Sequence, residues 1–214
     1  YSDGRHPDQV TFTNQITDDL ARRDFTINAM AYHPSRGLVD PFGGVQDLQE
    51  GLIQTVGDAD KRFDEDSLRI LRGLRFASTL GFDLSEACSA SIHRNRNLLV
   101  RVSKERIQVE LSKLLLGDGV KKILVQYHDV LSQVIPSIEP MVGFAQRNVH
   151  HCFDVWEHTA HAVAWASKDL IVRWTMLLHD MGKPCCFSMT EGNGHFYGHA
   201  GESANIARTV LADL

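Results

Sequence analysis

Residues 65–76 read Glu-Asp-Ser-Leu-Arg-Ile-Leu-Arg-Gly-Leu-Arg-Phe, and this stretch carries two stripes on one predicted helix. Leucines recur at every third residue, close to the helical period, and therefore form one apolar face. Arginines recur at the same spacing and form a second face, rotated by about 100° around the axis. These residues are Leu68, Leu71 and Leu74, and Arg69, Arg72 and Arg75. The pattern predicts a helix that is buried on one face and charged on the next.

Asp66 lies three residues before Arg69, within reach of it on a helix surface. A carboxylate accepts hydrogen bonds, whereas a guanidinium only donates them. The Watson–Crick edges of cytosine and adenine place an amino donor beside a ring-nitrogen acceptor, which complements this pair; those of uracil and guanine do not. The remaining arginines match the oxygens of a triphosphate. One interpretation is a helix that selects C or A nucleotides, and the other is an ordinary amphipathic helix with a solvated charged face.

Four segments resemble, in the same order, motifs of the tRNA nucleotidyltransferase and poly(A) polymerase family, in its bacterial CCA-adding, class II form. Residues 22–29 (Arg-Arg-Asp-Phe-Thr-Ile-Asn-Ala) resemble its ribose and phosphate motif, and residues 65–69 its base-selecting motif. Residues 40–48 resemble the hinge between its head and neck, and residues 101–111 its last neck motif. The resemblance implies tRNA as partner, ATP and CTP as substrates, and Mg²⁺ as cofactor. The nucleotide-binding residues that it implies are Arg22, Arg23, Asp24, Asp66, Arg69, Arg72 and Arg75.

The catalytic carboxylates of that family are missing from this sequence. In the family, a Gly-rich turn and an Asp-x-Asp pair precede the Arg-Arg-Asp motif and hold the triphosphate and two magnesium ions, which neutralise the developing charge. Here the Asp-x-Asp spacings are Asp58-x-Asp60 and Asp64-x-Asp66, and neither lies in an apolar strand. We therefore expect no catalytic residue for transfer, a chain that is a fragment beginning at Tyr1 within the head, and no nucleotide transfer by the chain as it stands.

The last third of the chain is rich in histidine. The order His158, His179-Asp180, His195 and His199, with Gly182-Lys183 after the His-Asp pair, resembles the HD superfamily of metal-dependent phosphohydrolases. The resemblance implies a divalent transition metal, which supplies an activated water for attack on a phosphoester. It implies His158, His179 and Asp180 as metal ligands, and His195 or His199 as a residue for a second metal or for the substrate phosphate.

Two further features of this region limit the HD prediction. The last aspartate of the family pattern normally lies on a later helix, and Asp213 is the only late candidate, at a spacing that does not fit. We therefore expect a C-terminally truncated domain with an incomplete metal site. His150 and His151 precede the predicted helix and are expected to be loop residues, because a lone histidine is more often a satisfied polar group than a ligand.

Composition bounds the class of protein. The chain has 214 residues, 43% apolar and 23% charged, as in soluble globular proteins, and it has no apolar run of membrane-spanning length, so a cytoplasmic location is expected. The net charge of −5 argues against a surface that binds nucleic acid throughout. Residues 61–113, however, hold eleven Lys or Arg against seven Asp or Glu, and this basic stretch suits phosphates. The cysteines show no C-x-x-C spacing and are expected to be reduced thiols: Cys88, Cys152, Cys185 and Cys186.

The predicted fold is mainly α, with a partial α/β nucleotidyltransferase head remnant, a helical neck and body, and an all-helical HD domain. We expect the head remnant at residues 1–57, the neck at 58–135 and the HD domain at 144–214, with a linker at 136–143. Strands are expected at 10–13 and 31–33. One helix is expected to begin near residues 58–64 and to run to residue 80. Further helices are expected at 18–30, 85–94, 103–116, 119–127, 155–166 and 170–178.

Three functional hypotheses from different classes remain open. The intact protein is a template-independent nucleotidyltransferase that acts on tRNA 3′ ends, or the chain is a phosphohydrolase that uses its histidine cluster, or it is only a tRNA-binding module. Within the first hypothesis, the motifs do not separate a CCA-adding enzyme from an A-only or CC-only relative or from a poly(A) polymerase. The identity of the metal and the oligomeric state are open as well.

Overall fold

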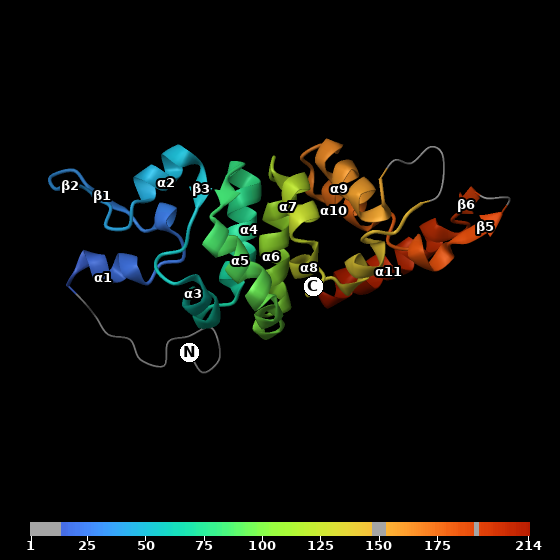
Figure 1. Ribbon diagram of the computed structural model, residues 1–214, viewed down its shortest axis with the longest axis horizontal. Coiled ribbons are helices and arrows are strands. Elements are labelled where there is room, and N and C mark those ends of the chain that lie inside the picture. Colours follow the sequence, from blue (N-terminus) through green and yellow to red (C-terminus); the bar gives the residue numbers. More distant parts are fainter. Residues whose placement is uncertain (1–13, 147–152, 191–192) are drawn as a thin grey trace.

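The computed structural model describes residues 14–146, 153–190 and 193–214. In Figure 1 the molecule is elongated, and its elements follow one another along the long axis, from strands β1 (Ala31–His33) and β2 (Gly37–Val39) at one end to β5 (Ser188–Thr190) and β6 (Asn193–His195) at the other. The predicted mainly helical character is confirmed. The described sheets are small and two-stranded: β1–β2 and β5–β6 are antiparallel, and β3–β4 is parallel.

The head segment is less helical than predicted. Helix α1 covers only Ile16–Ala21 and is followed by the 3₁₀ helix η1 (Thr26–Asn28), so the helix predicted for 18–30 is wrong beyond Ala21. The reason is that Phe25 has extended backbone angles and bridges to Thr55, while the Thr26 N–H donates to the Gln54 carbonyl at 2.9 Å. The strand at 31–33 is confirmed, and the one predicted at 10–13 lies outside the described residues. The remaining head elements are α2 (Gly44–Glu50) and β3 (Leu52–Ile53).

The arginine-rich segment forms two helices where one was predicted. Helix α3 covers Ala59–Glu65 and α4 covers Leu68–Leu80. The break lies at Asp66, whose backbone is extended (φ −146°, ψ 101°) and whose Oδ1 accepts the Leu68 N–H at the start of α4. Asp58 caps α3 through the Lys61 N–H, and Gly81, in the left-handed region, ends α4 as predicted.

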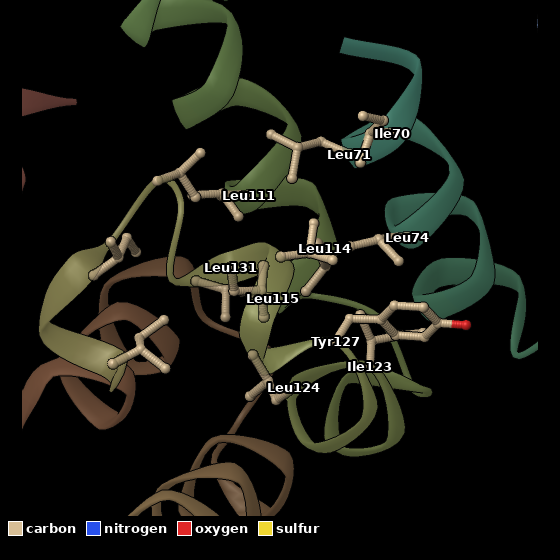
Figure 2. Close-up of a cluster of buried hydrophobic side chains, with 14 of the residues drawn as sticks. Ile70, Leu71, Leu74, Leu111, Leu114, Leu115, Ile123, Leu124, Tyr127 and Leu131 are labelled. Carbon is tan, nitrogen blue, oxygen red and sulfur yellow. The ribbon is translucent and has the colours of Figure 1, made fainter. Parts of the chain in front are cut away.

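The neck consists of short helices around a leucine-rich core. Ser85 caps α5 (Glu86–Asn95) by accepting the Cys88 N–H, whereas the Ser103 side chain, before α6 (Lys104–Leu115), makes no capping bond. Figure 2 shows the side chains of α4, α6, α7 and α8 meeting in this core, where Ile70, Leu71 and Leu74 are fully buried. The buried leucine face of the predicted helix is therefore confirmed. The neck elements are β4 (Asp83–Leu84), α5 (Glu86–Asn95), η2 (Arg96–Arg101), α6 (Lys104–Leu115), α7 (Val120–Gln126) and α8 (His128–Leu131).

The stretch predicted to be a linker is part of the core. Residues Pro136–Met141 form the 3₁₀ helix η3, in which Ile138 and Met141 are completely buried. The same core cluster continues into α9 (Val155–Trp165), where the buried Trp156 donates its indole N–H to the Leu124 carbonyl at 3.0 Å. The neck and the following helices thus share one apolar core. The limits of the predicted domains remain a prediction.

The histidine-rich region matches its predicted helices and adds a hairpin. Helices α9 and α10 (Leu170–Leu178) agree with the expected ranges, and Asp154 and Asp169 cap them. The prediction that this region is all-helical is wrong, because β5 and β6 form a hairpin before α11 (His199–Asp213), with the 3₁₀ helix η4 (Pro184–Cys186) ahead of it. His150 and His151 lie outside the described residues. Among the described residues, no helix combines the length and the apolar character needed to span a bilayer.

The cysteines that the structure describes are free thiols, as predicted. Cys88 is buried, and burial raises its pKa to about 12, which makes it unreactive. Cys185 is exposed and Cys186 is half-buried. Cys152 lies outside the described residues.

Gly117 sets the packing distance between α4 and the turn after α6. A Cβ atom there would lie 2.3 Å from Ser78 Oγ and 2.4 Å from the Ser78 carbonyl oxygen. Ser78 is fixed in turn, because its hydroxyl donates to the Leu114 carbonyl at 2.7 Å and its carbonyl accepts the Gly119 N–H at 2.9 Å. Ser78 therefore cannot move aside for a methyl group at position 117.

We predict that Gly117→Ala lowers the free energy of unfolding by about 1–3 kcal/mol, the usual cost of overpacking a core. Gly201→Ala is the matched control, because Gly201 lies in α11 with nothing within 4 Å of its Cβ position. Alanine there should be neutral or stabilising by a few tenths of a kcal/mol to about 1 kcal/mol. Urea unfolding followed by circular dichroism measures both, and equal midpoints for the two variants would contradict the packing argument.

Candidate nucleotide site and candidate metal centre

The Arg-Arg-Asp segment lies directly against α4. Gly73 of α4 faces Phe25, and a Cβ atom at Gly73 would lie 3.1 Å from Phe25 Cζ, so glycine allows this close approach. The Phe25 ring packs edge-on against Phe76, with 5.8 Å between centroids. Arg69 Nη2 donates to the Arg22 carbonyl at 3.0 Å. The structure thus brings the two quoted motifs together, although they are more than 40 residues apart in the sequence.

The strongest polar link between these segments joins Asp24 to Arg72. Arg72 Nε and Nη2 donate to Asp24 Oδ2 at 2.7 and 2.5 Å. Asp24 Oδ1 accepts the Phe25 N–H at 2.9 Å and the Asn28 amide at 3.2 Å. Burial alone raises the pKa of Asp24, but the charge of Arg72 and these hydrogen bonds outweigh burial and lower it. Asp24 is therefore a charged, almost buried anchor.

The arginine stripe of α4 is not a solvated face. The side chains of Arg69, Arg72 and Arg75 are only 12%, 32% and 15% exposed. Arg75 Nε donates to the buried Glu110 at 2.9 Å, and its guanidinium lies 3.5 Å from the centroid of the Phe76 ring. Each arginine has a carboxylate partner. The interpretation of this segment as an ordinary amphipathic helix with a solvated charged face is therefore wrong. Arg75 is held mainly by α6.

Asp66 and Arg69 do not form the pair that helical spacing predicted. Because Asp66 lies at the break before α4, its carboxylate pairs with Arg106 of α6, at 3.2 Å to Oδ1 and 3.0 Å to Oδ2. Arg69 pairs instead with Glu65 at 2.8 Å. The two side chains are each fixed by another partner.

The two arginines of the head motif differ from the rest. The side chains of Arg22 and Arg23 are 73% and 49% exposed, and both pair with Asp19 on the surface of α1. Such exposed ion pairs contribute little to stability and exchange readily with another anion. Arg22 and Arg23 are the candidate residues most open to a phosphate.

The Asp-x-Asp carboxylates serve the neck itself. Asp58 caps α3, and Asp60 accepts hydrogen bonds from the side chains of Ser91, Arg94 and Asn95 at 2.5–2.9 Å. Asp64 pairs with Arg101 at 3.0 Å. These contacts give the carboxylates structural roles.

A second cluster of polar side chains lies where α9 meets α10. His158 of α9, and His179 and Asp180 after α10, place one potential ligand atom each within 4.8 Å of one another. His158 Nε2 and His179 Nε2 lie 3.5 and 3.2 Å from Asp180 Oδ2, and His199 Nε2 lies 3.7 Å from Asp180 Oδ1. Ligands about 2.1 Å from one shared ion lie at most about 4.2 Å apart, so the distances of Asp180 from His158 and His179 fit a common metal. The structure places His199 beside Asp180, next to this group of three.

Backbone carbonyls orient two of these imidazoles. His179 Nδ1 lies 2.7 Å from the Met176 carbonyl, and His199 Nδ1 lies 2.7 Å from the Phe196 carbonyl. A carbonyl only accepts, so each Nδ1 carries the hydrogen and the lone pair of the neutral ring lies on Nε2, facing Asp180. This is the arrangement that prepares histidine for metal binding.

Asp180 is the buried centre of the cluster. Lys183 Nζ lies 2.8 Å from its Oδ2, yet Oδ2 has no partner with hydrogen-bond geometry among the described residues. Burial alone raises the pKa of Asp180, but the contacts with His179 and Lys183 lower it well below its usual range. The same carboxylate raises the pKa of His179 despite the opposing effect of burial. A buried, ionised oxygen among imidazole nitrogens is a set of donors that suits a divalent cation.

Gly182 allows α11 to reach this cluster. A Cβ atom there would lie 2.6 Å from both the His199 carbonyl oxygen and the Ser203 nitrogen, and the Gly182 N–H donates to Ser203 Oγ at 2.9 Å. His195 has a different position: it lies on β6 with its ring stacked on Tyr197. Of the two later histidines that the sequence offered, the structure therefore adds His199 to the cluster.

Sequence reasoning missed several residues that hold these sites. Glu65, Glu110 and Arg106 lie inside the quoted motifs, but they received no role because their partners come from another helix. Lys183 is part of the Gly182-Lys183 motif, but nothing in the sequence indicates its partner: Lys183 Nζ donates to Gln146 Oε1 at 2.9 Å. The sequence alone does not show that a charged residue is buried, because the partner that allows its burial comes from another part of the chain.

Comparisons with known proteins match two parts of the chain to described families. The family described as "Poly A polymerase head domain" matches residues 1–54, and "Probable RNA and SrmB-binding site of polymerase A" matches residues 81–141. The CCA-adding enzyme of Anoxybacillus flavithermus is 49% identical over 124 residues, which are 58% of this chain and 31% of that enzyme. That of Geobacillus thermodenitrificans is 38% identical over 186 residues, which are 85% of this chain and 43% of that enzyme.

A solved structure matches almost the whole chain. The Bacillus stearothermophilus CCA-adding enzyme in complex with CTP has a TM-score of 0.65 and 30% identity, covering 95% of this chain and 49% of that one. The chain thus spans less than half the length of each of these three relatives. Residues 1–54 are thus similar to the poly(A) polymerase head, and residues 81–141 to a probable RNA-binding site of polymerase A.

Proposed function

We propose that the chain is the nucleotide-selecting and tRNA-binding part of a CCA-adding tRNA nucleotidyltransferase. The observation that carries this proposal is the packing of the Arg-Arg-Asp segment on α4, where Arg69 donates to the Arg22 carbonyl and Arg72 to Asp24. Two relatives that are CCA-adding enzymes and a similar structure with bound CTP support it. A poly(A) polymerase of the same family is the alternative.

Observations on the described residues support each proposed contact. Arg22 and Arg23 bind phosphate or ribose, because they are the exposed arginines of the site. Asp66 accepts the amino group of C or A, while Arg106 keeps its carboxylate in place. Arg69 completes the base edge and Arg72 binds the triphosphate. Arg75 contributes through Arg72, because both contact Glu110.

Transfer requires carboxylates that hold Mg²⁺, and the sequence of this chain has no such pair in the head segment. The Asp-x-Asp pairs that it does have are occupied by caps and ion pairs. We therefore expect the 214-residue chain to bind nucleotides and tRNA without transferring a nucleotide. This leaves the roles of base selection open to test by binding alone.

Asp66→Asn is the sharpest test of base selection. Asparagine keeps the shape of aspartate but can place an N–H donor where an acceptor stood, so it opposes the amino groups of C and A. We expect the wild-type chain to bind CTP and ATP more tightly than UTP and GTP, and the variant to lose about tenfold of that preference, the value of about 1.4 kcal/mol from one charged hydrogen bond. Isothermal titration calorimetry with each nucleotide measures the ratio.

Asp64→Asn is the matched control for this test. Asp64 lies two residues away with its side chain 71% exposed, paired only with Arg101 on the surface. Its substitution should leave both affinity and selectivity unchanged. If Asp66→Asn keeps the wild-type ratio of CTP to UTP affinity, Asp66 does not read the base.

A second function is supported by the histidine cluster: a metal-dependent phosphohydrolase of the HD type. His158, His179 and Asp180 would hold a divalent ion, which when bound supplies an activated water for attack on a phosphoester, and His199, beside the other oxygen of Asp180, would bind a second metal or the phosphate. The residues of the chain itself prepare the site: the Met176 and Phe196 carbonyls orient two rings, and Lys183 lies beside the carboxylate. The HD domain that the sequence suggested is part of this proposal.

We predict that the wild-type chain binds one Mn²⁺ ion and that His179→Gln weakens binding at least tenfold. The expected loss reflects removal of one of the three ligands His158, His179 and Asp180, and effects of 10–100-fold are typical even for residues that only support a ligand. His195→Gln is the control, since the His195 ring stacks on Tyr197 outside the cluster, and it should bind Mn²⁺ as the wild type does. Equal weakening by both variants would place the metal elsewhere.

A further inference from the structure

A groove formed by α6, α10 and α11 borders the histidine cluster at His179. Its volume is about 600 Å³, within the range of roughly 300–1,000 Å³ that is usual for small-molecule pockets. Helices α10 and α11 contribute apolar walls, and α6 contributes polar side chains. The apolar lining residues are Leu170, Ile171, Trp174, Leu178, Ala200, Ala204, Ala207 and Leu211.

One side chain belongs to both the groove and the cluster. His179 lines the groove, and its Nε2 lies 3.2 Å from Asp180 Oδ2. A ligand in the groove therefore lies next to a residue that contacts the proposed metal. Ala200 and Ser203, which follow His199 on α11, line the same end. His179 is therefore the cluster residue through which the groove borders the proposed metal centre.

The polar groups of the groove can both donate and accept hydrogen bonds. Gln108 carries an amide with both functions. The Ser112 hydroxyl accepts the Trp174 indole N–H at 3.2 Å and keeps its own hydrogen for donation. The Thr175 hydroxyl donates to the Ile171 carbonyl at 2.8 Å and keeps lone pairs for acceptance. Polar groups between aliphatic walls suit a flat ring with a polar edge.

We propose that this groove binds the planar aromatic part of a phosphate ester whose phosphate reaches the histidine cluster. The apolar walls cover the two faces of the ring, and the proposed metal attracts the anionic phosphate. A purely aliphatic ligand would make no hydrogen bonds with Gln108 and Ser112, and a free anion would not contact the apolar walls. This proposal rests on the proposed metal centre, because it places the phosphate there.

The test uses the full chain with Mn²⁺ and three probes: 1-naphthyl phosphate, inorganic phosphate and 1-naphthol. Ala204→Leu fills the groove from α11 at an exposed position, so it should not disturb the core. We expect it to weaken binding of 1-naphthyl phosphate and of 1-naphthol at least fivefold and to leave inorganic phosphate and Mn²⁺ unaffected. Ala212→Leu, the same change at an exposed position of α11 outside the groove, should bind every probe as the wild type does.

The outcomes separate the groove from the metal centre. Wild-type affinity of Ala204→Leu for 1-naphthyl phosphate would overturn the groove proposal, as would equal affinity of the wild type for naphthyl and inorganic phosphate. Failure of the metal centre has a different signature, because the wild type would then bind no Mn²⁺ while 1-naphthol still bound to the groove.

Discussion

The ion pair between Asp24 and Arg72 is the contact on which the rest of the nucleotide site depends. It joins the head segment to α4, and its carboxylate is almost buried, with a lowered pKa. Removing one partner of such a pair leaves a buried charge uncompensated, which typically costs about 3–5 kcal/mol. The glycine at position 73 adds to this constraint, because it lets Phe25 pack on the helix beside the ion pair. The head segment therefore packs on α4 in one well-defined position.

Helix α6 is the second support of the site. Arg106 and Glu110 lie one turn apart and reach Asp66 and Arg75 respectively. They hold polar residues near the two ends of the arginine-rich segment, while Leu111 and Leu114 are buried in the core shown in Figure 2. The same helix thus fixes both the apolar and the charged face of α4. Packing and site geometry are not separable here.

Local sequence predicted the elements better than the partners of the charged residues. The leucine face of α4, its end at Gly81 and the helices at 155–166 and 170–178 follow from periodicity and caps. The break at Asp66 does not, because a spacing of three residues looks the same inside a helix and at its cap. Arg106 and Glu110 come from 40 and 35 residues away, and only the tertiary fold shows what they pair with. Likewise, only the β5–β6 hairpin decides that His199, and not His195, joins the cluster.

The proposed nucleotide site begins from a state in which its charges are already paired. Arg69, Arg72 and Arg75 have carboxylate partners, so a triphosphate must compete with Asp24 and Glu65 for them. The free energy of binding is then the difference between two sets of ion pairs, and it is smaller than the sum of the phosphate contacts. Selectivity is affected less, because Asp66 is held by Arg106 and does not exchange partners with the triphosphate. If the triphosphate binds weakly while Asp66, the residue proposed to contact the base, is held in place by Arg106, the site discriminates between bases without binding any nucleotide tightly.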